Sequence, residues 1–190
     1  MSKNAREAIL AAAKSAAQLH GYNGINFRSI AEEIGIKNAS ISYHFRKKAD
    51  LGAAVAERYW QDTLAVLERI RSATPDPREC LRQYPSVFRG SLENDNRLCM
   101  ASFMAAETDD LPDQVLSEIQ KFADINIEWL ADVLADIGYG DRQACMRRAR
   151  AIYTAVAGAQ LMARNRSDVS LFDDVMLTYQ EAGLLEAGPL

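Results

Sequence analysis

The sequence predicts an all-α protein of about nine helices. Apolar residues recur at helical spacing in successive segments of the 190-residue chain, and no segment makes a convincing strand. Gly, Pro, Asn and Asp stand between these segments, where helices are expected to begin or end. A hydrophobic content of 48% and a charged content of 25% are typical of a chain that folds around a core.

The first predicted helix covers residues 5–20. Asn4 and Glu7 before and within its first turn have the spacing of a capping box. Gly21 follows its last turn, where a residue without a side chain commonly ends a helix.

Two shorter helices are predicted next, over residues 27–34 and 39–45. Asn26 is expected to cap the first of them, because its side chain can accept from free backbone N–H groups. Gly35 is expected to end that helix in the left-handed conformation. Asn38 is a candidate cap for the second. The result is a pair of helices joined by a tight turn.

The second helix of this pair turns a small, polar and aromatic face outward. Ile41 and Phe45 are its inward residues, and a cluster of cations follows it at Arg46, Lys47 and Lys48. Such a pair suits the major groove of DNA. An ordinary helical hairpin with a solvated face would show the same pattern, so the pattern alone leaves both interpretations open.

Charge is distributed unevenly along the chain. The net charge is −4, yet residues 1–50 hold eight Lys and Arg against four Asp and Glu. The other 140 residues hold 14 basic and 22 acidic side chains. Only the N-terminal part is therefore suited to face phosphate.

The N-terminal part resembles the DNA-binding domain of the TetR family of bacterial repressors. The resemblance covers roughly the first 55 residues and is specific in order and spacing. It rests on Gly21-Tyr22, Ile30-Ala31, Gly35-Ile36, and Tyr43-His44-Phe45 followed by Lys48 and Leu51. It implies a helix-turn-helix domain over residues 1–50 and a helical ligand-binding and dimerisation domain over residues 51–190.

The resemblance assigns candidate DNA contacts to nine positions. These are Arg28, Lys37, Asn38, Ala39, Ser40, Ser42, Tyr43, His44 and Lys48. Asn38, Ala39, Ser40 and Ser42 would lie in the major groove, and Lys48 would contact a phosphate. Tyr43 and His44 would hold the DNA backbone, although Tyr43 could instead pack between helices and His44 could make a structural hydrogen bond.

Four positions depart from the family pattern. Lys37 stands where serine is usual, Ala39 where glycine is common, and Ser42 where tyrosine is frequent. These three are expected to change which bases are read. Lys47 replaces a serine that often caps the next helix, a change expected to remove a cap worth about 1 kcal/mol while adding a cation.

The rest of the chain is predicted to be helical as well. A helix over residues 48–71 follows without a flexible linker and is expected to join the two domains as one continuous rod. Further helices are predicted over residues 78–89 with a kink at Pro85, and over 97–106, 112–137, 141–165 and 169–180. Residues 91–96 are predicted to be a loop, and residues 181–190 a frayed tail.

The last two helices are expected to pair with those of a second copy. Small residues on the penultimate helix permit close helix contact, and a two-fold dimer would need a palindromic operator. The predicted interface consists of Ile152, Ala155, Val156, Ala159, Phe172 and Met176.

A small organic inducer is expected to bind among aromatic and polarisable side chains. The candidates are Trp60, Phe88, Cys99, Phe103, Glu107, Phe122, Trp129, Tyr153 and Gln160. Aromatic residues at helical spacing are also ordinary core residues. Cys99 could sense an electrophile or oxidant, or could be a buried, inert thiol. The inducer itself is not identified.

The composition argues against other classes of protein. Two histidines, three scattered cysteines and the lack of HExxH, GxSxG or phosphate-loop motifs indicate neither an enzyme nor a metal or cofactor site. The chain has no membrane-spanning run, and a cytoplasmic location is expected. The alternatives left open are a nucleoid-associated or protein-interaction module with incidental DNA binding, and a transcriptional activator.

Overall fold

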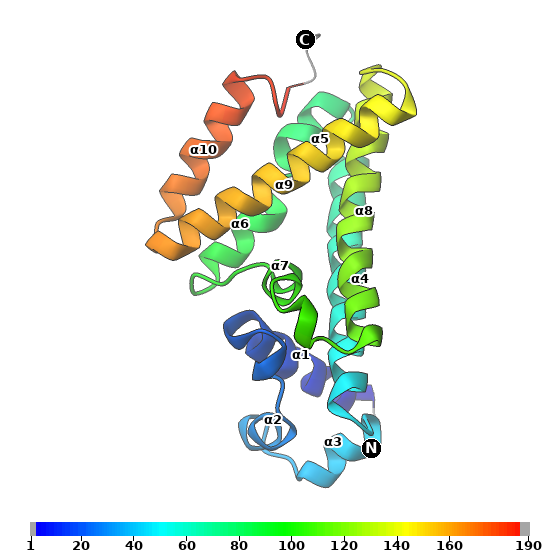
Figure 1. Ribbon diagram of the computed structural model, residues 1–190, viewed down its shortest axis with the longest axis vertical. Helices are drawn as coiled ribbons and strands as arrows, with labels where there is room; N and C mark the ends of the chain where they lie inside the picture. Colours follow the sequence, from blue (N-terminus) through cyan, green and yellow to red (C-terminus); the bar gives the residue numbers. More distant parts are fainter. Residues whose placement is uncertain (1–2, 187–190) are drawn as a thin grey trace. The chain divides into compact units, whose positions relative to one another are not determined.

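The computed structural model describes residues 3–186 and confirms the predicted all-α class (Figure 1). These residues form ten α-helices, two 3₁₀ helices and no strand. The chain divides into two compact units. Unit 1 consists of Met1–Gln61 and Cys99–Phe122, and unit 2 consists of Asp62–Leu98 and Ala123–Leu190.

Two long helices each contribute residues to both units. Unit 1 contains α1 (Lys3–His20), η1 (Tyr22–Gly24), α2 (Phe27–Glu33), α3 (Asn38–His44), the first half of α4 (Lys48–Ala73), α7 (Met100–Ala105), η2 (Thr108–Asp110) and the start of α8 (Asp113–Ile137). Unit 2 contains the remainder of α4 and α8 with α5 (Pro77–Gln83), α6 (Ser86–Glu93), α9 (Arg142–Arg166) and α10 (Val169–Glu181).

The short helices α2 and α3 are held in place by apolar residues. Each is seven residues long, too short to persist alone in water. Ile30 of α2 and Ile41 of α3 are almost completely buried, as is Ile9 of α1. Both short helices pack against α1. Their positions in unit 1 therefore depend on the burial of a few side chains.

The turn between α2 and α3 is a Schellman motif. Gly35 has φ +69°, as predicted for a residue that ends a helix in the left-handed conformation. The N–H of Gly35 donates to the carbonyl of Glu32 at 3.4 Å, and that of Ile36 donates to the carbonyl of Ala31 at 2.9 Å. These bonds satisfy the last carbonyls of α2 and turn the chain directly into α3.

One predicted cap is confirmed and another is wrong. The Asn26 side chain accepts from the backbone N–H groups of Arg28 at 2.9 Å and Ser29 at 3.1 Å, as expected. Asn38, by contrast, is the first residue of α3, and Lys37 occupies the cap position without a side-chain hydrogen bond. The helix begins one residue early because the N–H of Ser40 donates to the Lys37 carbonyl at 2.8 Å.

In unit 2, Pro85 divides the helix predicted over residues 78–89 instead of kinking it. Proline has no N–H to continue the hydrogen-bond ladder, and α5 ends at Gln83 before α6 begins at Ser86. Helix α6 then extends to Glu93, so the loop predicted over residues 91–96 is shorter than expected.

The segment after α10 is anchored to the core of unit 2 as far as it is described. Leu185 is completely buried, and Arg148 donates a hydrogen bond to the Gly183 carbonyl. A tail frayed from residue 181 onward is therefore a wrong prediction for this stretch. Residues 187–190, which belong to the same prediction, lie outside the described residues.

The predicted functional boundary at residue 50 remains a prediction. The compact units follow packing, and unit 1 combines the N-terminal helices with residues 99–122.

The Asn26 cap generates a prediction about stability. Asn26→Ala should lower the free energy of unfolding by about 1 kcal/mol, because two backbone N–H groups lose their acceptor. Urea denaturation followed by circular dichroism measures the change. Asn38→Ala is the matched control, since Asn38 is exposed and caps nothing. Equal losses in the two variants would contradict the role of the cap.

Candidate nucleic-acid interface

Helix α3 presents a continuous polar and aromatic face to solvent. Asn38, Ala39 and Ser42 are exposed, and Ser40 and His44 are partly exposed. The Tyr43 side chain is 80% exposed, which a tyrosine packed between helices would not be. Its ring meets the His44 ring edge to face, with centroids 5.2 Å apart.

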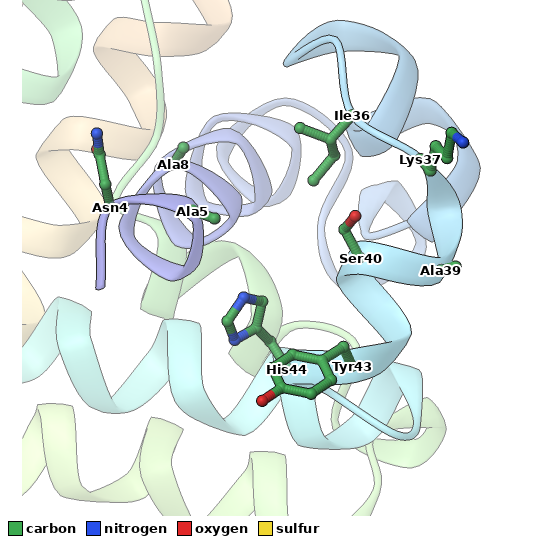
Figure 2. Close-up of a pocket in the computed structure, with 9 residues that line it drawn as sticks. All are labelled: Asn4, Ala5, Ala8, Ile36, Lys37, Ala39, Ser40, Tyr43 and His44. Atoms are coloured by element: carbon green, nitrogen blue, oxygen red, sulfur yellow. The ribbon is translucent and has the colours of Figure 1, made fainter. Parts of the chain in front are cut away.

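A shallow groove of about 720 Å³ lies between α1 and α3 (Figure 2). It is lined by Asn4, Ala5, Ala8, Ile36, Lys37, Ala39, Ser40, Tyr43 and His44. Five of these residues are predicted DNA contacts, whereas Asn4, Ala5, Ala8 and Ile36 were not predicted. The signal that could have found the α1 residues is the small side chains of Ala5 and Ala8, which lie on one helical face beside Asn4.

The cations around this face differ in what they contact. Lys37, Arg46 and Lys47 are exposed. The Arg28 Nε pairs with the Glu32 carboxylate at 3.0 Å, one helical turn away. Both side chains of that pair are well exposed, so the pair contributes little stability and a phosphate can replace the carboxylate.

Lys48, the predicted phosphate contact, is only partly exposed. Its Nζ lies 4.3 Å from the centroid of the Tyr22 ring, a cation–π distance. Burial lowers the pKa of Lys48 from its ordinary value, and the negative charge of Glu107 partly opposes that shift. The ammonium group is thus placed on an aromatic ring, where the charge of Glu107 acts on it.

The first turn of α4 retains half of a capping box despite Lys47. The Lys47 N–H donates to Asp50 Oδ2 at 3.0 Å, and Gln114 Nε2 donates to Asp50 Oδ1 at 3.2 Å. The hydrogen bond from Gln114, followed by that from Lys47, lowers the pKa of Asp50. Asp50 therefore satisfies the N–H of Lys47 itself, a different group from the first-turn N–H groups that a serine at position 47 would cap.

Four of the predicted ligand-binding residues lie in a buried aromatic cluster of unit 2. Phe88 and Tyr153 are in edge contact, with centroids 6.2 Å apart, and Gln160 Nε2 donates to the Phe88 carbonyl at 2.6 Å. Trp129 stacks on Tyr84, which also contacts Phe88. Gln160 is completely buried.

Sequence reasoning missed two members of this cluster, Tyr84 and Asn126. The Tyr84 hydroxyl donates to Asn126 Oδ1 at 3.0 Å, and both residues are completely buried. The available signal was Asn126, a polar residue within the apolar stripe of α8.

The other predicted ligand-binding residues belong to unit 1. Trp60 Nε1 donates to Glu118 at 2.7 Å, and Phe122 stacks on Tyr59. Glu107 accepts a hydrogen bond from the Tyr22 backbone. Cys99 is buried, and Phe103 is partly exposed.

No helix in residues 3–186 is long and apolar enough to cross a membrane. Within the same residues, His, Cys, Asp and Glu form no group of three or more that could hold a metal ion.

The short helix pair, its tight turn and the exposed face of α3 define a helix-turn-helix protein of the kind that binds DNA. The sequence profile described as "Bacterial regulatory proteins, tetR family" matches residues 9–55. The crystal structure of a TetR transcriptional regulator from Legionella pneumophila is 30% identical, with 96% of this chain and 97% of that chain covered and a TM-score of 0.87. The chain belongs to the TetR family and is a DNA-binding transcriptional regulator.

Other solved structures share the fold. A TetR-family regulator from Agrobacterium tumefaciens is 27% identical over 95% of this chain and 97% of its own, with a TM-score of 0.87. The regulator FadR from Bacillus subtilis, in complex with stearoyl-CoA, is 16% identical over 96% of this chain and 98% of its own, with a TM-score of 0.72. A search of curated proteins found no match.

The position of Lys48 generates a prediction about DNA affinity. Lys48→Ala should weaken binding to duplexes of every sequence and reduce the slope of log K against log salt by about one, because one phosphate contact is lost. Fluorescence anisotropy with a labelled duplex, from about 50 to 200 mM salt, measures both quantities.

Lys121→Ala is the control for Lys48→Ala, since Lys121 lies on α8 and pairs with Glu118 at 2.6 Å. An unchanged affinity and slope in Lys48→Ala would exclude Lys48 from the interface.

Proposed function

We propose that the protein is a homodimeric repressor that binds a palindromic operator and is released from it by a small organic molecule. Residues 1–50 are the DNA-binding domain in this proposal, and residues 51–190 are the ligand-binding and dimerisation domain. The observation that carries it is the exposed face of α3, where Ser40, Tyr43 and His44 line one groove with the cation Lys37.

The chemistry of this face favours sequence-specific DNA as the partner. Asn38 can pair with adenine, Ser40 can bond to several base edges, and Ala39 can contact a thymine methyl group. Tyr43, His44 and the cations at its border are suited to the sugar-phosphate backbone. A protein that binds a specific DNA sequence needs side chains that contact base edges, surrounded by side chains that contact phosphates.

The dimer interface is proposed to use the solvent-facing side of α9 and α10. Five of the six predicted interface residues are buried inside the single chain, and only Ala155 is partly exposed. The neighbouring apolar side chains Leu161 and Leu177 are each 55% exposed, and Met162 is 41% exposed. Gly158 of α9 is exposed as well, so a second copy can approach this helix closely.

The ligand is proposed to be a largely apolar molecule with at least one polar group. The buried cluster of unit 2 offers aromatic rings for the apolar part. Trp129 Nε1 is buried with no hydrogen-bond partner among the described residues, so it can donate to an oxygen atom of the ligand. FadR, a regulator that shares this fold, forms a complex with stearoyl-CoA.

Ligand binding is proposed to change the separation of the two α3 helices in the dimer. An operator with half-sites in successive major grooves requires a separation of about 34 Å. Helix α4 begins at Lys48 beside α3 and continues to Ala73, so it links the residues that face DNA to the remainder of the chain. A displacement of α4 would then alter the fit to both half-sites.

Selection of bound duplexes from a random pool tests the proposed function. The selected sequences should be palindromic, because two copies related by a two-fold axis read the two half-sites. Ser40→Ala should alter base preference within each half-site while changing affinity for arbitrary duplexes little. Absence of any preferred sequence would favour the nucleoid-associated alternative. Transcription assays on the selected operator then separate repression from activation, and a small-molecule screen for release identifies the inducer.

The exposed leucines generate a prediction about assembly. Leu161→Glu should convert the dimer to a monomer at micromolar concentration, because it places a charge in the apolar interface. Analytical ultracentrifugation measures the change, and Leu177→Glu should act in the same direction. Leu19→Glu is the matched control, since Leu19 of α1 is 39% exposed but lies outside the proposed interface. A dimer that survives both α9 and α10 substitutions would refute this interface.

A further inference from the structure

Glu107 caps a turn that lies 85 residues away in the sequence. The backbone N–H of Tyr22, the first residue of η1, donates to Glu107 Oε2 at 2.6 Å. Gly21 occupies the cap position of this turn and has no side chain that could accept a hydrogen bond from it. The Glu107 carboxylate thus serves the N-terminus of η1 as a local Asp or Ser would.

Gly21 leaves the space that this contact requires. A β-carbon placed on Gly21 would lie 2.2 Å from Glu107 Oε2, far inside any normal contact distance. Gly21 also has φ +64°, a conformation that glycine adopts without strain. Both the missing side chain and the positive φ of Gly21 are therefore consistent with the position of the Glu107 carboxylate.

Tyr22 connects the docked carboxylate to Lys48. Its ring is buried and packs closely against Gly52 of α4, where an added β-carbon would lie 2.8 Å from ring atom Cε2. The Lys48 ammonium lies 4.3 Å from the centroid of the same ring. Glu107 and Lys48 therefore both contact Tyr22, one at its backbone N–H and the other at its ring, and the negative charge of Glu107 favours the protonated form of Lys48.

A second contact holds the same segment to the start of α4. Gln114, seven positions after Glu107 in the sequence, donates to the carboxylate of Asp50, which accepts from the Lys47 N–H as well. Residues on both sides of η2 therefore contact groups beside Lys48.

We propose that Glu107 is a positioning residue for DNA binding, whose carboxylate, held at the Tyr22 backbone N–H, attracts the Lys48 ammonium on the Tyr22 ring and competes with DNA phosphate for it. This inference rests on the proposed use of Lys48 as a phosphate ligand. Glu107 was predicted to bind the inducer, and the present geometry gives it a partner within unit 1 instead.

The test is Glu107→Gln, measured by anisotropy with a labelled duplex of arbitrary sequence at low salt. Glutamine retains the size of the side chain and an oxygen that accepts from the Tyr22 N–H, so η1 keeps its cap. Only the charge is removed. Affinity should rise about fivefold, because the negative charge of Glu107 no longer competes with a phosphate for Lys48.

Two controls separate this effect from a general change in charge. Asp110→Asn removes the same charge from exposed η2 and should change affinity less than about twofold. In a Lys48→Ala background, Glu107→Gln should have no more effect than Asp110→Asn, because the competing cation is absent. Thermal unfolding of each variant verifies that the fold is retained.

Each outcome decides the inference. An increase in DNA affinity in Glu107→Gln that is lost in the Lys48→Ala background supports the role of Glu107. A fall in affinity, a rise no larger than that of Asp110→Asn, or a rise that persists without Lys48 overturns it. If the wild-type protein shows no salt-dependent binding to any duplex, the proposed DNA-binding function fails first, and the result is distinguishable from failure of the role of Glu107.

Discussion

The burial of single side chains from very short helices is the constraint on which the DNA-facing surface depends. Helix α3 is seven residues long, and isolated helices of that length do not form in water. Ile41 is its one buried residue, and Phe45 directly after it is buried as well. Packing of these two side chains fixes the rotation of α3, and that rotation places every polar side chain of its outer face in solvent.

A few contacts also determine which charges of unit 1 remain exposed. Glu7 pairs with Arg58 at 2.7 Å and Glu32 pairs with Arg28, so two acids near the N-terminal helices already face cations. Glu107 is placed by a backbone N–H beside Lys48. The exposed cations that remain can attract a polyanion, although the chain as a whole carries a net charge of −4.

Two features governed by local hydrogen bonds, the Asn26 cap and the Gly35 turn, could be predicted from the sequence, whereas features governed by distant packing could not. Asn26 and Gly35 act on backbone groups within a few residues of themselves, and both were predicted correctly. Pro85 was recognised as a disruption, but whether it kinks or ends a helix depends on its neighbours in space. The contact of Glu107 with η1 joins residues with no local relation, and the burial of Ile152 within its own chain depends on how α9 packs against α6 and α10.

The two tryptophans of the chain are divided between its compact units. Trp60 belongs to unit 1 and is hydrogen-bonded to the Glu118 carboxylate, whereas Trp129 belongs to unit 2 and is buried against Tyr84. Each unit therefore contains its own natural fluorophore in a distinct environment. Replacing either tryptophan with phenylalanine leaves a single indole, so that fluorescence excited selectively at tryptophan reports on the unit that contains it.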